Sequence, residues 1–405
     1  MRAAFFNLLV FTSVLITACS APREKTLLVT PIASPAVHNS LTPNLFTARD
    51  GKVYLSWLEK KDTVALFKFA LLEENIWSAP NQIAEGSNWF VNWADFPSLI
   101  VNDGVFSAHW LQKRAAGTYD YDVRIAQSVD GGKTWGDSFI PHTDGIAAEH
   151  GFVSMLAQNN GQNFATWLDG RNTKMGEGES HHGHGGAMTL RAGSFDNNGQ
   201  MISDTELDNR TCDCCQTAAA FTSSGPIVAY RDRSDLEIRD IYVTRQVDGK
   251  WSTPSAVFND NWKIEGCPVN GPSISANGDK VAIAWFTAAQ GFGEVKLAFS
   301  GDAGASFSNP VVLAKGNTTG RVGTSILSNG TTAISWMETA GDMAQIMLAL
   351  FDKTGKEINR TTLAETSAAR ASGFPVITEF GEQLVASWTE TGESSQVKTA
   401  LITYH

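Results

Sequence analysis

A strand-like segment that ends in a large aromatic residue recurs seven times along the chain, at intervals of 51 to 63 residues. Most copies have a small or polar residue before the aromatic and an apolar residue after it, as in YLSWLE and AISWME. One four-stranded sheet cannot bury both of its faces, but a ring of such sheets can, and a period of about 50 residues is typical of that arrangement. We therefore predict an all-β fold, a β-propeller of four-stranded blades with seven blades, or six with one irregular repeat. The aromatic residues are Trp57, Trp110, Trp167, Tyr230, Trp285, Trp336 and Trp388.

Each repeat has an internal order that fits four strands. A Pro-x-Leu or Pro-x-Ile segment often comes first, the aromatic strand follows, and turns rich in Gly, Asn and Asp separate the alternating runs, as hairpin meanders require. The last repeat starts near Ser372 and runs out at His405 with only three strands. We expect Thr26 to Ile32 to supply the fourth strand, which would close the ring and hide two sheet edges.

The composition fits one large β domain. No Pro/Ser-rich linker or run of charge divides the 405 residues, and 12 Trp with 36 Gly suit packed blades joined by tight turns. The net charge is −11, and no basic cluster suggests nucleic acid as a partner. We expect residues 26–405 to form one propeller, which we predict to be a monomer.

The first 18 residues have the pattern of an export signal. Arg2 precedes an apolar run from Phe5 to Ile16, which is too short for a permanent membrane span, and small residues follow. Residues 15–19 (LITAC) resemble the bacterial lipobox, in which the cysteine is lipidated and becomes the first mature residue. The resemblance implies a lipoprotein signal peptide at 1–18, a lipidated tether at 19–25 and an anchor at Cys19 in the cell envelope, with the outer membrane favoured because Ser20 replaces the Asp of inner-membrane retention. An ordinary signal peptide is the alternative.

Two polar turns share the pattern S-x-D-x-G-x-[ST]-[WF]: Ser128 to Trp135 and Ser300 to Phe307. This pattern resembles the Asp-box of sialidases and other BNR-repeat propellers, and a degenerate copy lies at Gln246 to Trp251. The Asp and Ser side chains can bond the backbone of the turn between the third and fourth strands, while the aromatic fills the space between blades. We therefore expect a sialidase-like propeller and a structural, not catalytic, role for Asp130 and Asp302.

The loops of a propeller alternate between two faces. Turns that join the first to the second strand and the third to the fourth share one face. Loops after the aromatic strand and between blades share the other, which we call the mouth face. We expect the mouth face to carry function, because nearly all unusual residues fall in its loops. These loops are Trp89 to Asp95, Arg114 to Asp122, Glu149-His150, Asp169 to Arg171, Glu177 to His184, Cys212 to Cys215, Arg231 to Asp240 and Trp262 to Pro272.

The resemblance to sialidases implies an arginine trio that holds a substrate carboxylate, a Tyr nucleophile with a Glu partner and an Asp acid/base. Arginine suits a carboxylate because its planar fork donates paired hydrogen bonds and stays charged. The FRIP-type arginine of the first blade is missing, since that position reads Thr42 to Leu45 (TPNL), and no Tyr and Glu pair can be placed. The catalytic residues therefore stay unknown, and mutual pairing within RDRSDLEIRD is the alternative role for its charges. The candidate ligand-binding residues are Arg171, Arg231, Arg233, Arg321 and Asp232, with Arg239 nearby.

Acidic residues also recur two positions after the aromatic of a repeat. Such repetition favours a role in the scaffold over a unique catalyst. The residues are Glu59, Asp169, Asp232, Glu338 and Glu390.

Four cysteines besides Cys19 lie in two inter-blade loops that bracket one repeat: Cys212, Cys214, Cys215 and Cys267. In an exported protein an even number first suggests two disulfides. A copper or zinc site is the alternative, with imidazoles from His150 or from His181, His182 and His184, because soft thiolate with imidazole suits Cu(I) or Zn(II). Redox-active thiols are a third hypothesis. The CDCC segment, with YRDRS and DNWKIEGCPVNGP, resembles a subgroup of sialidase-like exported bacterial proteins.

Two functions of different classes follow. In the first, the protein binds an acidic glycan at the arginine-bearing mouth face, or hydrolyses it as an exo-glycosidase. In the second, it is a non-catalytic propeller that holds copper, zinc or a protein partner at its Cys and His loops. A membrane contact is expected only through the anchor at Cys19.

Overall fold

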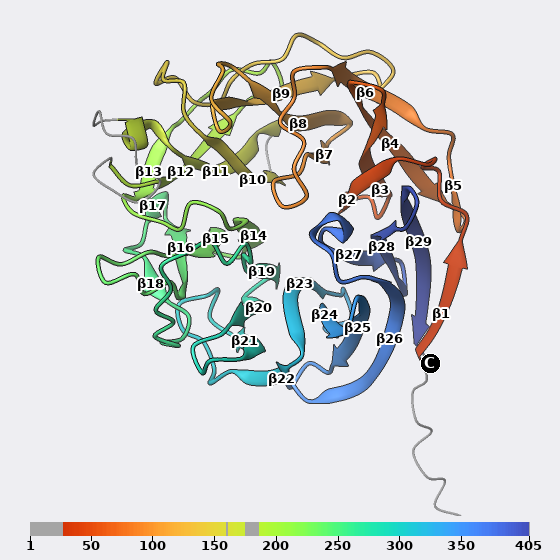
Figure 1. Cartoon of the computed structure of the whole chain (residues 1–405), viewed down its shortest axis with the longest axis vertical. Helices are drawn as coiled ribbons and strands as arrows, with labels where there is room; N and C mark the ends of the chain where they lie inside the picture. Colours follow the sequence, from red (N-terminus) through yellow and green to blue (C-terminus); the bar gives the residue numbers. More distant parts are fainter. Residues whose placement is uncertain (1–26, 159–160, 175–185, 405) are drawn as a thin grey trace, which may run out of the picture.

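The computed structural model describes residues 27–158, 161–174 and 186–404, and they form a ring of seven sheets around a central channel (Figure 1). Four sheets have four strands, two have five because the outer strand is split, and one has three. The seven-bladed β-propeller is therefore confirmed, and the alternative of six blades is wrong. The predicted signal peptide, tether and Cys19 lie outside the described residues.

In six of the sheets the strands follow one another in sequence from the channel outward, and in the last blade β27, β28 and β29 do so while β1 forms the outer edge. The innermost strands are β2 (Ser40–Thr47), β7 (Ser98–Asn102), β10 (His150–Ala157), β14 (Ala218–Thr222), β19 (Ser273–Asn277), β23 (Thr318–Ile326) and β27 (Val376–Phe380). The second strands are β3 (Val53–Lys61), β8 (Val105–Lys113), β11 (Asn163–Asp169), β15 (Gly225–Arg231), β20 (Lys280–Thr287), β24 (Thr332–Ala340) and β28 (Gln383–Thr391).

The third strands are β4 (Val64–Glu73), β9 (Tyr121–Ser128), β12 (Thr189–Phe195), β16 (Ile241–Val247), β21 (Gly293–Ser300), β25 (Met343–Phe351) and β29 (Ser395–Tyr404). The outer strands are β5 (Ile76–Trp77) with β6 (Asn81–Gly86), β13 (Thr205–Asp208), β17 (Lys250–Trp251) with β18 (Ser255–Ala256), β22 (Val311–Gly316), β26 (Glu357–Ser367) and β1 (Leu27–Ile32). In the second blade, a bridge between Ile125 and Phe139 stands at the outer edge. Two short 3-10 helices, η2 (Arg171–Lys174) and η3 (Arg370–Ser372), lie in mouth-face loops.

The recurring aromatic lies in the second strand of every blade, as predicted, and its side chain is buried. Seven hydrophobic clusters fill the structure, and each combines residues of two neighbouring blades. Three of the recurring acids also have a structural partner. In each case the indole Nε1 of the aromatic donates to the acid two positions later. The distances are 2.8 Å from Trp57 to Glu59, 2.9 Å from Trp167 to Asp169 and 2.7 Å from Trp336 to Glu338.

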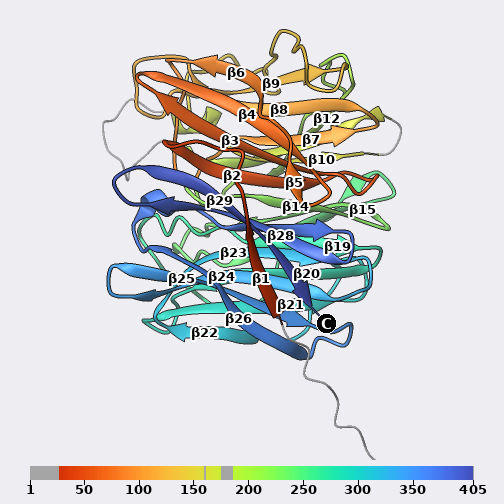
Figure 2. The same ribbon diagram turned by 90° about the vertical axis from the view of Figure 1, so that its right-hand side faces the viewer.

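The ring closes through its last blade. Strand β1 pairs antiparallel with β29, with Leu27 opposite Tyr404 and Ile32 opposite Thr399. Figure 1 shows β1 at the outer edge of the ring, and in Figure 2 it runs along the outside of the disc. The expected fourth strand is thus supplied from the beginning of the described chain, and it covers the free edge of β29.

The two Asp-box turns have the structural role expected of them. In the first, Asp130 Oδ1 accepts the backbone N–H of Thr134 at 2.9 Å, and Ser128 Oγ accepts that of Gly132 at 3.0 Å. Asp302 and Ser300 make the equivalent bonds to Ser306 and Gly304. These carboxylates satisfy the donors of their own turns, on the face opposite to the mouth.

Two adjacent glycines of the first Asp-box turn, Gly131 and Gly132, differ in how closely they pack against the rest of the protein. Gly131 and Gly132 both have positive φ, +78° and +81°, but a Cβ on Gly132 would lie 2.4 Å from Phe69 Cζ, whereas one on Gly131 would meet nothing within 4 Å. We expect Gly132→Ala to lower the free energy of unfolding by about 1–3 kcal/mol more than Gly131→Ala, because only the former overpacks the core. Urea unfolding of the two variants measures the difference, and equal losses would contradict the packing.

Candidate functional site

A loop of the second blade crosses the mouth of the channel (Figure 1). The ring of Trp93 stacks on Phe374, before β27, with centroids 5.8 Å apart and an interplanar angle of 12°. The carbonyl of Ala94 accepts a hydrogen bond from Gln216, before β14, at 2.6 Å. Because these partners belong to the seventh and fourth blades, residues 89–96 span the mouth, and we call them the mouth strap.

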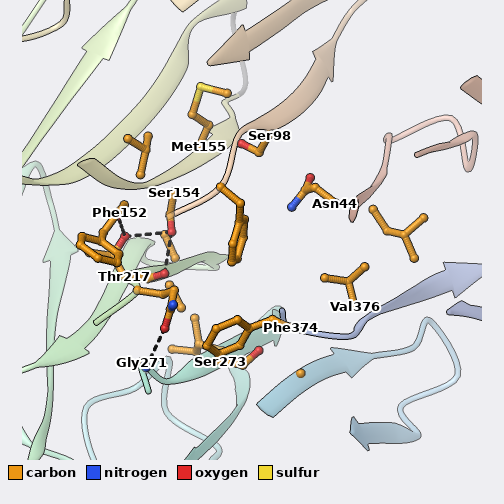
Figure 3. A pocket seen from close by; sticks show the side chains of 18 of the residues that line it. Asn44, Ser98, Phe152, Ser154, Met155, Thr217, Gly271, Ser273, Phe374 and Val376 are labelled. Atoms are coloured by element: carbon orange, nitrogen blue, oxygen red, sulfur yellow. Dashed lines mark hydrogen bonds between the residues drawn. The ribbon is translucent and has the colours of Figure 1, made fainter. Parts of the chain in front are cut away.

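Beneath the mouth strap lies the channel cavity, with a volume of about 300 Å³. Residues of all seven inner strands or the loops before them line it, and Figure 3 shows its small polar side chains among aromatic and aliphatic ones. Ser154 Oγ donates to the carbonyl of Thr217 at 2.9 Å, and Thr217 Oγ1 donates to that of Phe152 at 2.7 Å. Asp95 is the one ionisable residue among the described residues of the lining. These residues therefore offer no cation to an acidic ligand.

Two cations, the buried Arg321 and the exposed Arg370, lie beside Trp93 of the mouth strap. The guanidinium carbons of Arg321 and Arg370 lie 5.0 Å and 6.0 Å from the ring centre of Trp93. Burial, together with the charge of Arg370, lowers the pKa of Arg321 to about 10. Among the described residues, no carboxylate pairs with either guanidinium. Two like charges thus share one aromatic ring in a protein whose net charge is −11.

A surface pocket of about 490 Å³ adjoins this cluster. Trp93 and Asn92 of the mouth strap form one wall, Lys60 near the end of β3 and Asp62 of the β3–β4 turn form another, and Ala371, the residue after Arg370, also lines it. An aromatic surface beside a small number of polar and charged groups is a common composition for a ligand site. We call this the Trp93 pocket.

The predicted arginines come to different places on the mouth face. Arg171 pairs with Asp169 through two bonds of 2.8 Å and 2.7 Å, and Arg233 pairs with Glu237. Arg231 is 1% exposed and donates to the carbonyls of Arg239, Asn270 and Phe286. Arg321 donates to Ser372 and to the carbonyls of Ala369 and Gly373. Asp232 is partly buried, and burial with nearby Asp208 raises its pKa to about 7. Ligand contacts by these five residues stay a prediction.

A Tyr and Glu pair, which the sequence did not place, lies beneath the mouth strap. The hydroxyl of Tyr121 is 2.9 Å from Glu149 Oε1 and 3.0 Å from Asp95 Oδ2. Burial raises the pKa of Asp95 to about 7 and that of Glu149 to about 8. The hydroxyl has one hydrogen to donate, so a proton on one of the two carboxyls would satisfy both contacts, in line with the raised pKa values. Tyr121 itself is 0% exposed and stacks on Phe90 at 4.2 Å, which leaves its oxygen no path to a substrate.

A second buried cluster surrounds two stacked imidazoles, His142 and His150, whose ring centres are 3.7 Å apart. Asp144 Oδ2 lies 3.1 Å from a nitrogen of each ring, and Asp169 lies 3.5 Å from His150 Nε2. His150 Nδ1 faces the backbone carbonyls of Tyr121 and Ala148, and Asp122 Oδ1 lies 4.0 Å from it. Both nitrogens of His150 therefore act as donors. Despite burial, the bonds to Asp144 and Asp169 raise its pKa to about 9. His150 thus belongs to a buried group of carboxylates and imidazole, and it is not part of the group that the three thiols of the CDCC loop form.

The four cysteines gather on the mouth face and are free thiols in the structure. Cys212 Sγ lies 3.7 Å from Cys214 Sγ and 3.6 Å from Cys215 Sγ. Burial raises the pKa of Cys212, but hydrogen bonds from the other two thiols and the charge of Arg239 outweigh it, and the pKa ends well below its usual value. Cys267, which is exposed, approaches Cys214. The predicted proximity of the CDCC loop and Cys267 is thus found, whereas His181, His182 and His184 lie outside the described residues.

The comparisons with known proteins place the fold. No family model matches the sequence, and no curated protein matches it either. Similar solved structures include a protein of unknown function from Dyadobacter fermentans (12% identity, TM-score 0.53, 94% of this chain and 100% of the other) and a family PL25 ulvan lyase (11%, 0.52, 91% and 92%). The endosialidase of phage phi92 is also similar (8%, 0.51, 94% and 69%). These likenesses confirm a sialidase-like propeller, and at such identities they carry the fold alone. Among the described residues no helix is long and apolar enough to cross a membrane.

Proposed function

We propose that the protein binds an acidic glycan at the Trp93 pocket. The observation that carries the proposal is the pair Arg321 and Arg370, which both lie close to the ring of Trp93 and have no carboxylate partner among the described residues. An anion would relieve the repulsion between the two guanidinium groups, and Arg370 is exposed and free to donate paired hydrogen bonds.

Binding is proposed without hydrolysis. Glycoside hydrolysis uses two carboxyl groups, or a Tyr with a carboxyl partner, that reach the scissile bond. The group that has this composition is Tyr121 with Glu149 and with Asp95 of the mouth strap, and in it Tyr121 is fully buried. An exo-glycosidase activity therefore stays a prediction from resemblance, as do the lipid anchor at Cys19, the envelope location and the monomeric state.

The test compares acidic and neutral oligosaccharides of the same backbone by titration calorimetry. We expect binding only of the carboxylated or sulfated forms, weakened by rising salt. Arg370→Gln should weaken binding by about 10- to 100-fold, as loss of a charged hydrogen bond does. Lys353→Gln is the matched control. Lys353 is an exposed cation in the β25–β26 turn of the blade that holds Arg321, on the face of the disc opposite to the mouth. Equal affinity for the neutral sugar, or an unchanged affinity in Arg370→Gln, would overturn the proposal.

A further inference from the structure

The CDCC loop holds three sulfur atoms at separations that a metal ion would impose. Cys212 Sγ lies 3.7 Å and 3.6 Å from its two neighbours, and all three ligand atoms are within 4.8 Å of one another. A metal–thiolate bond of about 2.3 Å places the sulfurs about 3.8 Å apart at tetrahedral angles and about 4.0 Å apart in a trigonal site. We propose that Cys212, Cys214 and Cys215 bind one soft metal ion, with Cu(I) favoured over Zn(II).

Hydrogen bonds to neighbouring segments hold the CDCC loop in this conformation without a metal ion. The N–H of Cys212 donates to the carbonyl of Arg231 at the end of β15, at 3.0 Å, and Thr211 forms a bridge with Asp232. Gln216, directly after the three thiols, donates to Ala94 of the mouth strap and accepts the N–H of Gly271 at 2.9 Å. The chain is therefore held on both sides of the thiol triad by blades that do not depend on the metal.

Groups around the triad match the needs of thiolate ligands. Arg239 Nη1 points at Cys212 Sγ at 3.3 Å, and the backbone N–H of Asn270 points at Cys215 Sγ at 3.4 Å. Donors of this kind orient the ligands of a metal and offset their charge. Cys212 and Cys215 are each 1% exposed, while Cys214 is partly exposed and gives an ion a path to the site.

The number of ligands favours Cu(I). Cys267 meets Cys214 and Asp213 within 4.8 Å but does not join the group formed by the three thiols. In the described chain no imidazole joins that group either. Thiolate sites select soft ions, and Zn(II) almost always takes four ligands, whereas a set of three thiolates suits Cu(I). This site is separate from the Trp93 pocket, so either proposal can fail without the other.

The experiment uses the full chain in a Cys19→Ser background, which leaves the four mouth-face thiols as the only ones among its five cysteines. The reduced protein is titrated with Cu(I) against a coloured Cu(I) chelator, and separately with Zn(II). We expect one equivalent of Cu(I) and a thiolate-to-metal charge-transfer band. Cys214→Ser, which replaces a partly exposed residue and should spare the fold, is expected to weaken binding by about 100-fold or more. Arg239→Gln should weaken it by about 10- to 100-fold, and Arg239→Lys by less.

Cys267→Ser is the matched control, since it removes an exposed thiol outside the triad. Stoichiometric Cu(I) binding that survives in Cys267→Ser supports the three-thiolate site. Zn(II) binding that needs Cys267 as well as the triad supports the soft-metal site with the other ion. The proposal is overturned if the folded, reduced protein binds neither ion, or if Cys214→Ser binds Cu(I) as tightly as its parent. It is also overturned if native protein holds its four thiols as two disulfides that resist mild reduction. Circular dichroism and thermal melting confirm that each variant is folded.

Discussion

Replacing Arg231 with methionine is expected to lower the free energy of unfolding by about 3–5 kcal/mol. The guanidinium donates to the carbonyls of Arg239, Asn270 and Phe286 and is 1% exposed, so water cannot replace it. Each buried acceptor that loses its donor costs about 1–3 kcal/mol. The guanidinium also lies 4.9 Å from the ring centre of Trp262, and this cation–π contact would be lost with it.

Urea unfolding of Arg231→Met beside the parent chain measures this loss. The matched control is Arg210→Met. Arg210 pairs with Asp235, whose side chain is 89% exposed, and such a surface pair contributes about 1 kcal/mol at most. Similar losses in the two variants would mean that Arg231 does not hold the blades together. The backbone carbonyl of Arg231 accepts the N–H of Cys212, so a shift of the backbone in the variant should also loosen the thiol triad.

The second large effect is a loss of stability on the alkaline side, carried by His150. Its folded pKa of about 9 lies above the unfolded value near 6.5, so its contribution is complete below pH 6.5 and is lost as the pH rises through 9. The shift corresponds to about 3 kcal/mol, and its side chain is 0% exposed, so solvent screening is small. The pKa values of Asp144 and Asp169 are lowered despite burial, and their contribution is lost only in acid.

Unfolding free energies measured from pH 6 to pH 10 test this expectation. The difference between the parent and His150→Gln should be largest near pH 6 and should shrink by about 3 kcal/mol toward pH 10. His109→Gln is the control: His109 is also buried, but burial lowers its pKa to about 3, so it carries no charge that titrates over this range. A pH-independent difference for His150→Gln would show that the ring is neutral in the folded protein.

The periodic part of the structure could be predicted because each blade repeats the same pattern of strands, turns and buried aromatic residue. Trp57 and Trp336 stand at the same point of their strands, and each bonds the acid two positions later. The closing strand could also be predicted, since a last repeat with three strands leaves an unpaired edge. Both inferences need only the alternation within a strand and the geometry of a ring.

The candidate sites depended on contacts that sequence spacing does not encode. Trp93 and Arg370 are far apart in the chain and meet because a loop crosses the channel. Tyr121, Glu149 and Asp95 come from three separate segments on the same side of the ring. The roles of the arginines could not be predicted. The sequence around an arginine that binds backbone carbonyls, such as Arg231, does not differ from that around an arginine that binds a ligand. The cysteines were easier, since both of their loops flank a single blade.

The pairing of β1 with β29 also sets a direction. Leu27 lies opposite Tyr404, whose hydroxyl accepts a hydrogen bond from Asn329 in the β23–β24 turn, so β1 begins on the face of the Asp-box turns. Whatever precedes Leu27 is attached behind the disc. If Cys19 carries a lipid, as the sequence predicts, seven residues separate it from Leu27, and the face of the Asp-box turns would be the one turned to the bilayer. The Trp93 pocket and the thiols would then look outward, toward large soluble ligands and not toward lipid.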